Sequence, residues 1–123
     1  MTVRWSDEEL RLIDAAHELS IAVRNPDGSL RPSLPVWVVC AGDQVYVRTW
    51  YRRDTGWFGR VLRSPRARIG VPGLEADVTA EDVGDASVTA DVDGAYRAKY
   101  GSGGAESMVT AAAAATTLRL DRE

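Results

Sequence analysis

The segment from Arg48 to Arg68 gathers positive charges and aromatic rings within one short stretch of chain. It reads RTWYRRDTGWFGRVLRSPRAR and holds seven arginines, four aromatic residues and a single acid, Asp54. The planar guanidinium group suits a phosphate or carboxylate bound through paired hydrogen bonds. The segment therefore predicts a site for a flat ligand that carries an anionic group. The alternative is a solvated face whose arginines pair with acids of this chain or of a partner subunit.

This positive segment belongs to an acidic protein. The segment sums to +6 and, because the 123-residue chain carries −3 at pH 7, the remainder sums to −9. A local field of this kind favours one bound anion over a general attraction to polyanions. The sequence pI of about 5.2 and the lack of a lysine-rich stripe argue against nucleic acid as a partner.

Few other residues could carry chemistry. Cys40 is the only cysteine and His17 the only histidine, so an internal disulfide is excluded and a Cys/His zinc site is not expected. His17 lies in a predicted helix with no nucleophile motif nearby, which argues against a Ser-His-Asp triad. The acids scattered between Glu75 and Asp85 are typical of solvated positions, and we expect no metal site.

One lysine is flanked by tyrosines at helical spacing. This spacing places Tyr96 beside both Lys99 and Tyr100 on a helix. A Tyr–Lys pair could serve in acid–base chemistry if the pKa of the lysine were lowered. The alternative, which we favour, is a surface helix that packs two tyrosines.

Length and hydropathy indicate a single domain over residues 1–123. No apolar run approaches the roughly 18 residues that a membrane-spanning helix needs. The N-terminal stretch MTVRWSDEEL is acidic and polar and lacks the apolar core of a signal peptide. We therefore expect a cytoplasmic protein that does not associate with membranes.

The elements that must position the arginines begin with a well-marked helix. Ser6 is a good N-cap, and Glu9 completes a capping box, so a helix is predicted from about Asp7 to about Leu19. Further on, the chain is expected to form strands at 20–23, 36–40, 45–50, 66–71, 74–80 and 116–120, and short helices at 55–63, 94–100 and 106–115. Because this order lacks βαβ regularity, it predicts an α+β fold with an antiparallel barrel or a highly curved sheet.

A further ordered set of motifs runs from Pro35 to Val78. A strand that starts at a proline, PVWVV, is followed by a Gly-Asp turn and a second strand, VYVRT. A short helix led by Trp57, the pair Ser64-Pro65 and another strand come next. This order resembles the flavin-binding split barrel, whose branches include the pyridoxamine 5′-phosphate oxidases and the deazaflavin-dependent nitroreductases. The resemblance implies an antiparallel split β-barrel with an N-terminal helix and short crossing helices.

Nearly the whole chain is similar to a small bacterial family of this length in the same split-barrel group. The matching motifs are EL at 9–10, DGSLR at 27–31, VWVV at 36–39, YVR at 46–48, AYRAKY at 95–100 and TTLRL at 116–120. This second resemblance implies fold more than function, since it brings no activity with it.

The split-barrel resemblance implies a homodimer with FMN or a deazaflavin bound at the subunit interface. In such proteins the cofactor phosphate is held by basic and hydroxyl residues at the end of the second hairpin strand and in the following loop. Here those positions are Arg48, Thr49, Arg52, Arg53 and Thr55. Trp57 and Arg60, at the head of the short helix, could line the same site, where the helix N–H groups add a positive end.

Two functions follow from these readings. The first is a flavin- or deazaflavin-dependent oxidoreductase acting on a small molecule, in which the cofactor carries the redox chemistry. The second is a cofactor-free binding or biosynthetic tailoring protein that uses an arginine–aromatic pocket for an anionic metabolite. The second stays open because the loop 51–56 is short, lacks the lysine- and glycine-rich stretch of the deazaflavin enzymes, and shows no oxidase-type phosphate motif.

Overall fold

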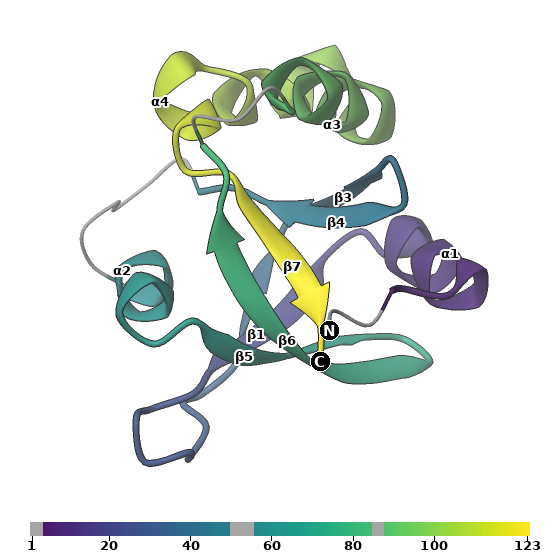
Figure 1. Cartoon of the computed structure of the whole chain (residues 1–123). Helices are drawn as coiled ribbons and strands as arrows, with labels where there is room; N and C mark the ends of the chain where they lie inside the picture. Colours follow the sequence, from purple (N-terminus) through teal and green to yellow (C-terminus); the bar gives the residue numbers. More distant parts are fainter. Residues whose placement is uncertain (1–3, 50–55, 85–87) are drawn as a thin grey trace.

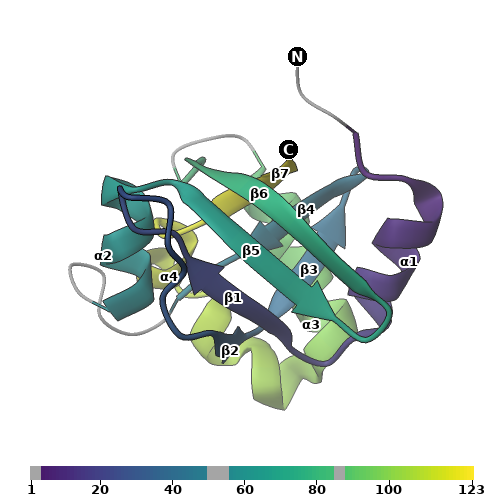
Figure 2. The same ribbon diagram turned by 90° about the horizontal axis from the view of Figure 1, so that it is seen from below.

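The computed structural model describes residues 4–49, 56–84 and 88–123 (Figure 1). Within these residues, seven strands form one antiparallel sheet in the order β2-β1-β5-β6-β7-β4-β3. The strands are β1 (Leu19–Val23), β2 (Leu34–Val36), β3 (Val38–Ala41), β4 (Gln44–Val47), β5 (Arg66–Val71), β6 (Leu74–Asp82) and β7 (Leu118–Arg122). Figures 1 and 2 show the sheet curling round a shared interior, with the helices on its outside.

The sheet is a nearly closed barrel because its two edges meet at one residue. β2 ends at Val36 and β3 begins at Val38, yet these strands lie at opposite ends of the strand order. Only Trp37 separates them in the chain. The prediction of a single strand over 36–40 is therefore wrong, because β2 pairs with β1 whereas β3 pairs with β4. The prediction of an α+β fold with an antiparallel split barrel is confirmed.

Helix α1 (Asp7–Ala15) lies beside the barrel, at the right of Figure 1. The predicted capping box is present: the Ser6 hydroxyl accepts a hydrogen bond from the Glu9 N–H, and the Glu9 carboxylate accepts one from the Ser6 N–H. The helix ends well before Leu19 because Ala16 takes an extended conformation, with ψ of 134°, and leads into β1.

Two apolar clusters lie on the two faces of the sheet. The first fills the barrel and draws on every strand; Trp5 joins it and donates its indole N–H to the Leu120 carbonyl at 3.0 Å. The second lies between the outer face of β3 and β4 and helix α3 (Thr89–Ala105). Its buried members are Val39, Tyr46, Val92, Tyr96, Ala105 and Met108.

Helix α3 covers the top of the barrel in Figure 1. It begins at Thr89, ahead of the predicted start at Gly94, and so takes up residues whose sequence was ambiguous between strand and helix. The predicted break at Gly101 appears as a kink with φ of 79° and ψ of 165°, a conformation that glycine adopts without steric cost. No helix in the described part of the chain is long and apolar enough to cross a membrane.

The chain between α3 and β7 is more broken than its alanine content predicts. In place of one helix over 106–115, the structure has a 3-10 turn (Glu106–Met108) and a single helical turn, α4 (Ala111–Ala114). The Thr110 hydroxyl accepts a hydrogen bond from the Ala113 N–H and so starts α4 afresh. Local propensity is overridden here because Ala113 packs into the interior and the chain must turn into β7.

Helix α2 (Gly56–Arg63) closes one side of the barrel, at the left of Figure 1. Phe58 and Val61 point into the barrel core, whereas Leu62 is 48% exposed. The predicted helix over 55–63 is thus present, with its apolar face against β1 and β6. Figure 2 shows the β1–β2 connection running beside this helix.

Candidate functional site

Arg48, the first residue of the predicted anion site, lies inside the protein. It follows β4, and its side chain is fully buried beneath α3. The guanidinium pairs with Asp93 at 2.5 Å and donates to the Thr117 hydroxyl at 2.8 Å and the Met108 carbonyl at 2.8 Å. A longer bond of 3.4 Å reaches the Thr89 carbonyl. All three guanidinium nitrogens therefore already donate to groups of the protein.

Through these bonds, Arg48 links the end of β4 to the helical segment that follows β6. Its Cζ also lies 5.6 Å from the ring centroid of Tyr96, so a cation–π contact adds to the hydrogen bonds. With the side chain 0% exposed, a phosphate in solution has no access to the guanidinium in this conformation. The expectation that Arg48 anchors a cofactor phosphate conflicts with this burial, and the structure gives the residue a role in holding the fold together.

Thr49, the second predicted residue, is also buried. Its N–H donates to the Thr116 hydroxyl at 3.0 Å, and that hydroxyl lies 2.9 Å from the Thr49 carbonyl. This reciprocal contact binds the end of β4 to the turn that precedes β7. Three further predicted site residues, Arg52, Arg53 and Thr55, lie outside the described residues.

Trp57 and Arg60, the remaining predicted residues, lie three positions apart on α2. Trp57 is half-buried, packs against the barrel core and meets the Phe58 ring edge-on, with 5.9 Å between the ring centroids. Arg60 is partly exposed and lines a pocket between α2 and the β1–β2 connection. The structure thus brings Trp57 and Arg60 together on one helix and places Arg48 and Thr49 elsewhere, within the interior.

Sequence reasoning missed the arginines that share a pocket with Arg60. Arg24 and Arg31, from the ends of the β1–β2 connection, and Arg63, from the last turn of α2, line the same pocket. Arg24 and Arg31 lie far upstream of the arginine-rich segment, so no local pattern joins them to it. The turn signal at Asn25–Gly28 was the available hint, because a tight turn returns the chain and brings its two flanks together.

The tyrosine–lysine cluster of α3 uses its polar atoms on the backbone. The Lys99 ammonium donates to the Val38 carbonyl at 2.8 Å, and the Tyr100 hydroxyl accepts from the Val38 N–H at 3.0 Å. Trp37 stacks on Tyr100 with 4.2 Å between ring centroids and 4° between ring planes. Burial lowers the pKa of Lys99 and raises that of Tyr100. These contacts fasten α3 over the junction of β2 and β3, which supports the packing interpretation of the cluster.

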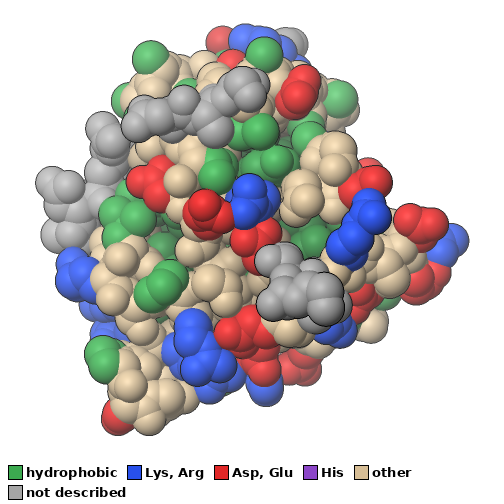
Figure 3. Space-filling model, viewed as in Figure 1, with side chains coloured by type: hydrophobic (Ala, Val, Ile, Leu, Met, Phe, Trp, Pro, Cys, Tyr) green, Lys and Arg blue, Asp and Glu red, His purple; other side chains and the backbone are tan. Residues whose placement is uncertain are grey.

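Metal and thiol chemistry find little support among the described residues. Within them, no group of three or more His, Cys, Asp or Glu side chains could hold a metal ion. The Cys40 thiol is a poor nucleophile at neutral pH, since burial raises its pKa to about 11. On the face shown in Figure 3, side chains of both charges are interspersed, and no large area of one sign stands out.

Solved structures with the same fold include flavin proteins. The conserved hypothetical protein Rv2991 from Mycobacterium tuberculosis superposes with a TM-score of 0.66 and 14% identity over 98% of this chain and 80% of its own. A FAD-binding protein from Mesorhizobium loti gives a TM-score of 0.59 and 15% identity over 99% and 91% of the two chains. An F420 reductase gives 0.55 and 14% over 92% and 90%. Likeness at this level of identity establishes a shared split-barrel fold.

Comparison by sequence matches the chain to one bacterial protein family. No curated protein matches it. Residues 9–120, however, match the profile of a family described as "Uncharacterized protein conserved in bacteria (DUF2255)". That match covers nearly all of the barrel and its helices, and the chain therefore belongs to the bacterial family DUF2255, built on the split-barrel fold of the flavin proteins.

Proposed function

We propose that this protein binds FMN or a deazaflavin and acts as an oxidoreductase on a small molecule. The observation that carries the proposal is the split-barrel fold, which this protein shares with a FAD-binding protein and an F420 reductase over nine-tenths or more of each chain. The half-buried Trp57 and the partly exposed Arg60 on α2 add a ring and a cation of the kinds that such a ligand needs.

The residues present fit a flavin in part. We do not include Arg48, because its guanidinium is bonded to Asp93, the Thr117 hydroxyl and the Met108 carbonyl, nor Thr49, which is buried and whose N–H is bonded to the Thr116 hydroxyl. We propose Arg60, together with Arg52, Arg53 and Thr55 of the preceding segment, as the groups that hold the phosphate. A bound flavin would supply hydride or electron transfer, and the protein would bind it, orient it and exclude water from it.

The proposal includes a homodimer in the bacterial cytoplasm, with the ligand near the subunit interface. Leu30 on the β1–β2 connection and Leu62 on α2 are the large apolar side chains exposed in the described part, at 41% and 48%. Their two segments line a common pocket and lie next to each other in Figure 2, so a partner subunit at this side would cover both. Light scattering at micromolar concentration that gives the mass of one chain would remove the dimer from the proposal.

A second function is favoured by the burial of Arg48. If the residues after β4 serve the fold, the remaining arginines could act as a cofactor-free site for an anionic metabolite. This would be a binding or biosynthetic tailoring protein on the same barrel. Such a protein would be colourless as purified and would not respond to flavins.

Titration with flavins separates the two. We would add FMN, and separately a deazaflavin, to the purified protein while recording visible absorbance, and would follow each with thermal melts. Binding is expected to perturb the spectrum and raise the Tm, and Arg60→Gln is expected to weaken it roughly tenfold, the scale of one charge-assisted hydrogen bond. The control is Arg97→Gln, at an exposed position of α3. No response to either flavin would overturn the first function and leave the second.

A further inference from the structure

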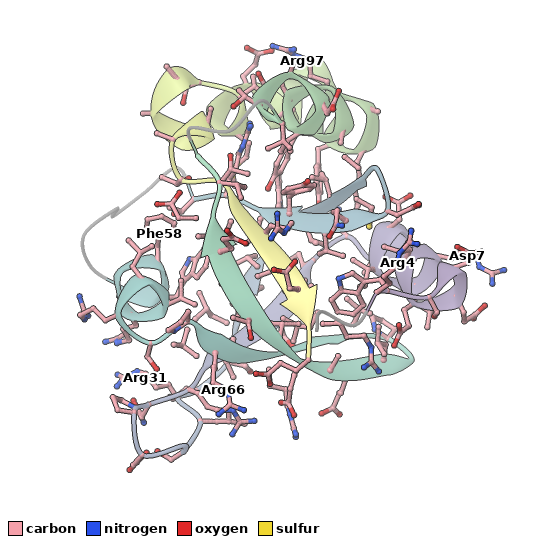
Figure 4. All side chains as sticks on the ribbon, viewed as in Figure 1. Arg4, Asp7, Arg31, Phe58, Arg66 and Arg97 are labelled. Atoms are coloured by element: carbon pink, nitrogen blue, oxygen red, sulfur yellow. The ribbon has the colours of Figure 1, made fainter. Side chains whose placement is uncertain are left out.

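A pocket of about 280 Å³ lies where the C-terminal half of α2 meets the β1–β2 connection. Four arginines line it: Arg24, Arg31, Arg60 and Arg63. Its remaining lining residues are Val23, Asn25, Pro26 and Ser64, so no acid lines it. The Ser64 hydroxyl donates to the Arg24 carbonyl at 2.8 Å and fixes the two walls to each other. Figure 4 shows Arg31 beside α2, on the side of the molecule away from α3.

Three of these four arginines form no ion pair with an acidic residue of the described chain. Eight of the twelve arginines in the described part of the chain form ion pairs with acids. The four described arginines without such a pair are Arg31, Arg60, Arg63 and Arg97. Three of them line this one pocket, in a protein with more acids than bases. If ion pairing were distributed at random over the surface arginines, the arginines without an acidic partner would not be expected to share one pocket.

The fourth arginine of the pocket is held in place with one donor unused. Arg24 Nη2 pairs with Asp77 at 2.9 Å, and Nη1 donates to the Gly28 carbonyl at 2.8 Å. Arg24 Nε is buried and has no partner, and it is the single such side-chain atom in the part of the chain that the structure describes. An unpaired buried donor costs free energy, and it is the kind of group that a bound ligand satisfies.

Helix electrostatics explain only part of the arrangement. Arg60 and Arg63 lie in the last turn of α2, where cations complement the helix dipole. That effect gives no reason for Arg31 and Arg24 to approach from the other side. It also leaves the Arg24 Nε without a partner. Several guanidinium groups that converge on a small pocket match an anion with several oxygens and more than one charge.

We propose that this pocket binds the phosphate group of a small phosphomonoester. A dianionic phosphate offers three terminal oxygens, so it could accept bonds from several arginines at once, whereas one carboxylate offers two. Arg31 also lines a second, more open hollow of about 760 Å³ over the outer face of β1 and β5. The body of the ligand would lie along Arg31 into that hollow, whose walls include Leu30, Pro35 and Ser33.

This site goes beyond the proposed flavin site and does not depend on it. The flavin is proposed at the N-terminal end of α2 and the segment before it, whereas the phosphate pocket lies at the C-terminal end. Arg60 is the one residue common to both, so it is left unchanged in the test. Arg31 and Arg63 belong only to the phosphate pocket.

The test is calorimetric titration of the full-length protein, free of flavin, with inorganic phosphate, glycerol 3-phosphate and glycerate. The variants are Arg31→Gln and Arg63→Gln, and the matched control is Arg97→Gln, an exposed arginine on α3 at the other end of the molecule (Figure 4). We expect glycerol 3-phosphate to bind more tightly than glycerate. Each pocket variant should weaken that binding roughly tenfold, and Arg97→Gln should leave it unchanged. Thermal melts of the unliganded variants establish that they fold.

Each other outcome overturns the proposal. Equal binding of glycerate and glycerol 3-phosphate would mean that the pocket does not select phosphate. Equal losses in all three variants would mean that the protein attracts anions only through its general field. The flavin titration is repeated on Arg31→Gln and Arg63→Gln. If both lose flavin affinity together with phosphate affinity, the pocket is the flavin's own phosphate site and not a separate one. Flavin binding without phosphate binding would refute this inference alone.

Discussion

The backbones of Gly84 and Ala115 approach each other so closely that there is no room for a side chain at position 84. A β-carbon on Gly84 would lie 2.1 Å from the Ala115 carbonyl oxygen and 2.7 Å from its carbonyl carbon. The adjacent Val83 N–H donates to the Thr117 carbonyl at 2.9 Å, and this hydrogen bond holds the two segments together just beyond the ends of β6 and β7. The segment that follows β6 thus meets the C-terminal end of α4 through bare backbone.

We therefore expect Gly84→Ala to destabilise the protein by about 1–3 kcal/mol, the usual range for inserting a group into filled space. The two backbone segments cannot move apart without straining the Val83–Thr117 hydrogen bond. Urea denaturation gives the change in the free energy of unfolding. The matched control is Gly94→Ala, because a β-carbon there meets nothing within 4 Å. In the interior of α3 this change should stabilise by roughly 0.5–1 kcal/mol. The same sign for both variants would contradict the packing at Gly84.

Arg48→Met should be among the most destabilising substitutions in the chain. It removes one member of a buried ion pair and leaves Asp93, the Thr117 hydroxyl and the Met108 carbonyl without their donor. Breaking such a pair from one side costs about 3–5 kcal/mol. Arg48→Lys should also destabilise, since an ammonium cannot reproduce the three directions of the guanidinium.

The control for Arg48 is Arg11→Met, which breaks the exposed Arg11–Glu8 pair of α1 and should change little. Equilibrium urea unfolding of the three variants ranks them. A stable Arg48→Met protein that has lost flavin binding would reverse the interpretation and restore the role that the sequence alone suggested for this residue.

Arg48 also shows how far the sequence could be read. The alternation of Val45, Tyr46, Val47 and Arg48 correctly predicts two faces of one strand, with the valines in the barrel core and Tyr46 on the outer face. What it could not indicate is that α3, much later in the chain, covers this outer face and supplies Asp93 as the partner. An arginine beneath a distant helix and an arginine facing solvent have the same local sequence.

Local signals were reliable where the physics is local. The Ser6–Glu9 capping box depends only on residues three apart, and it forms as predicted. The change of strand partner at Trp37 depends on how the whole barrel closes. The local sequence pattern therefore predicted one strand over 36–40 where the structure has the end of β2 and the start of β3. The sequence did not predict the arginine pocket for the same reason, because Arg31 and Arg63 are brought together only by the tertiary fold.

Acid should weaken the fold partly through Asp77. Hydrogen bonds from Arg68 and then Arg24 lower the pKa of this carboxyl below its ordinary value of 3.8. The ionised form is therefore favoured by folding. Its contribution to stability is fully present above the ordinary pKa and is lost as the pH falls through the lower, folded-state value.

We expect Asp77→Asn to be less stable than the parent protein at neutral pH, and the difference in Tm to shrink as the pH falls below about 3.8. The comparison isolates Asp77 because every other carboxyl is common to both proteins. Melts across this pH range make the measurement. A difference in Tm that stays constant down to the lowest pH would mean that the loss comes from the amide substitution and not from the charge.

Cys40 should react with iodoacetamide far more slowly than an ordinary thiol. Burial, and to a lesser degree the charge of Asp14, raise the pKa of the thiol to about 11, and Lys99 opposes this shift. At pH 8 roughly one thiol in a thousand is then ionised, whereas an ordinary thiol is about one-quarter ionised. The rate should be roughly a hundredfold or more below that of the same protein unfolded in urea.

The rate should also keep rising about tenfold per pH unit up to pH 10, because the thiolate population is still growing there. A buried thiol of ordinary pKa would react slowly too, but its rate would level off above about pH 9. A plateau of that kind would show that access alone limits the reaction.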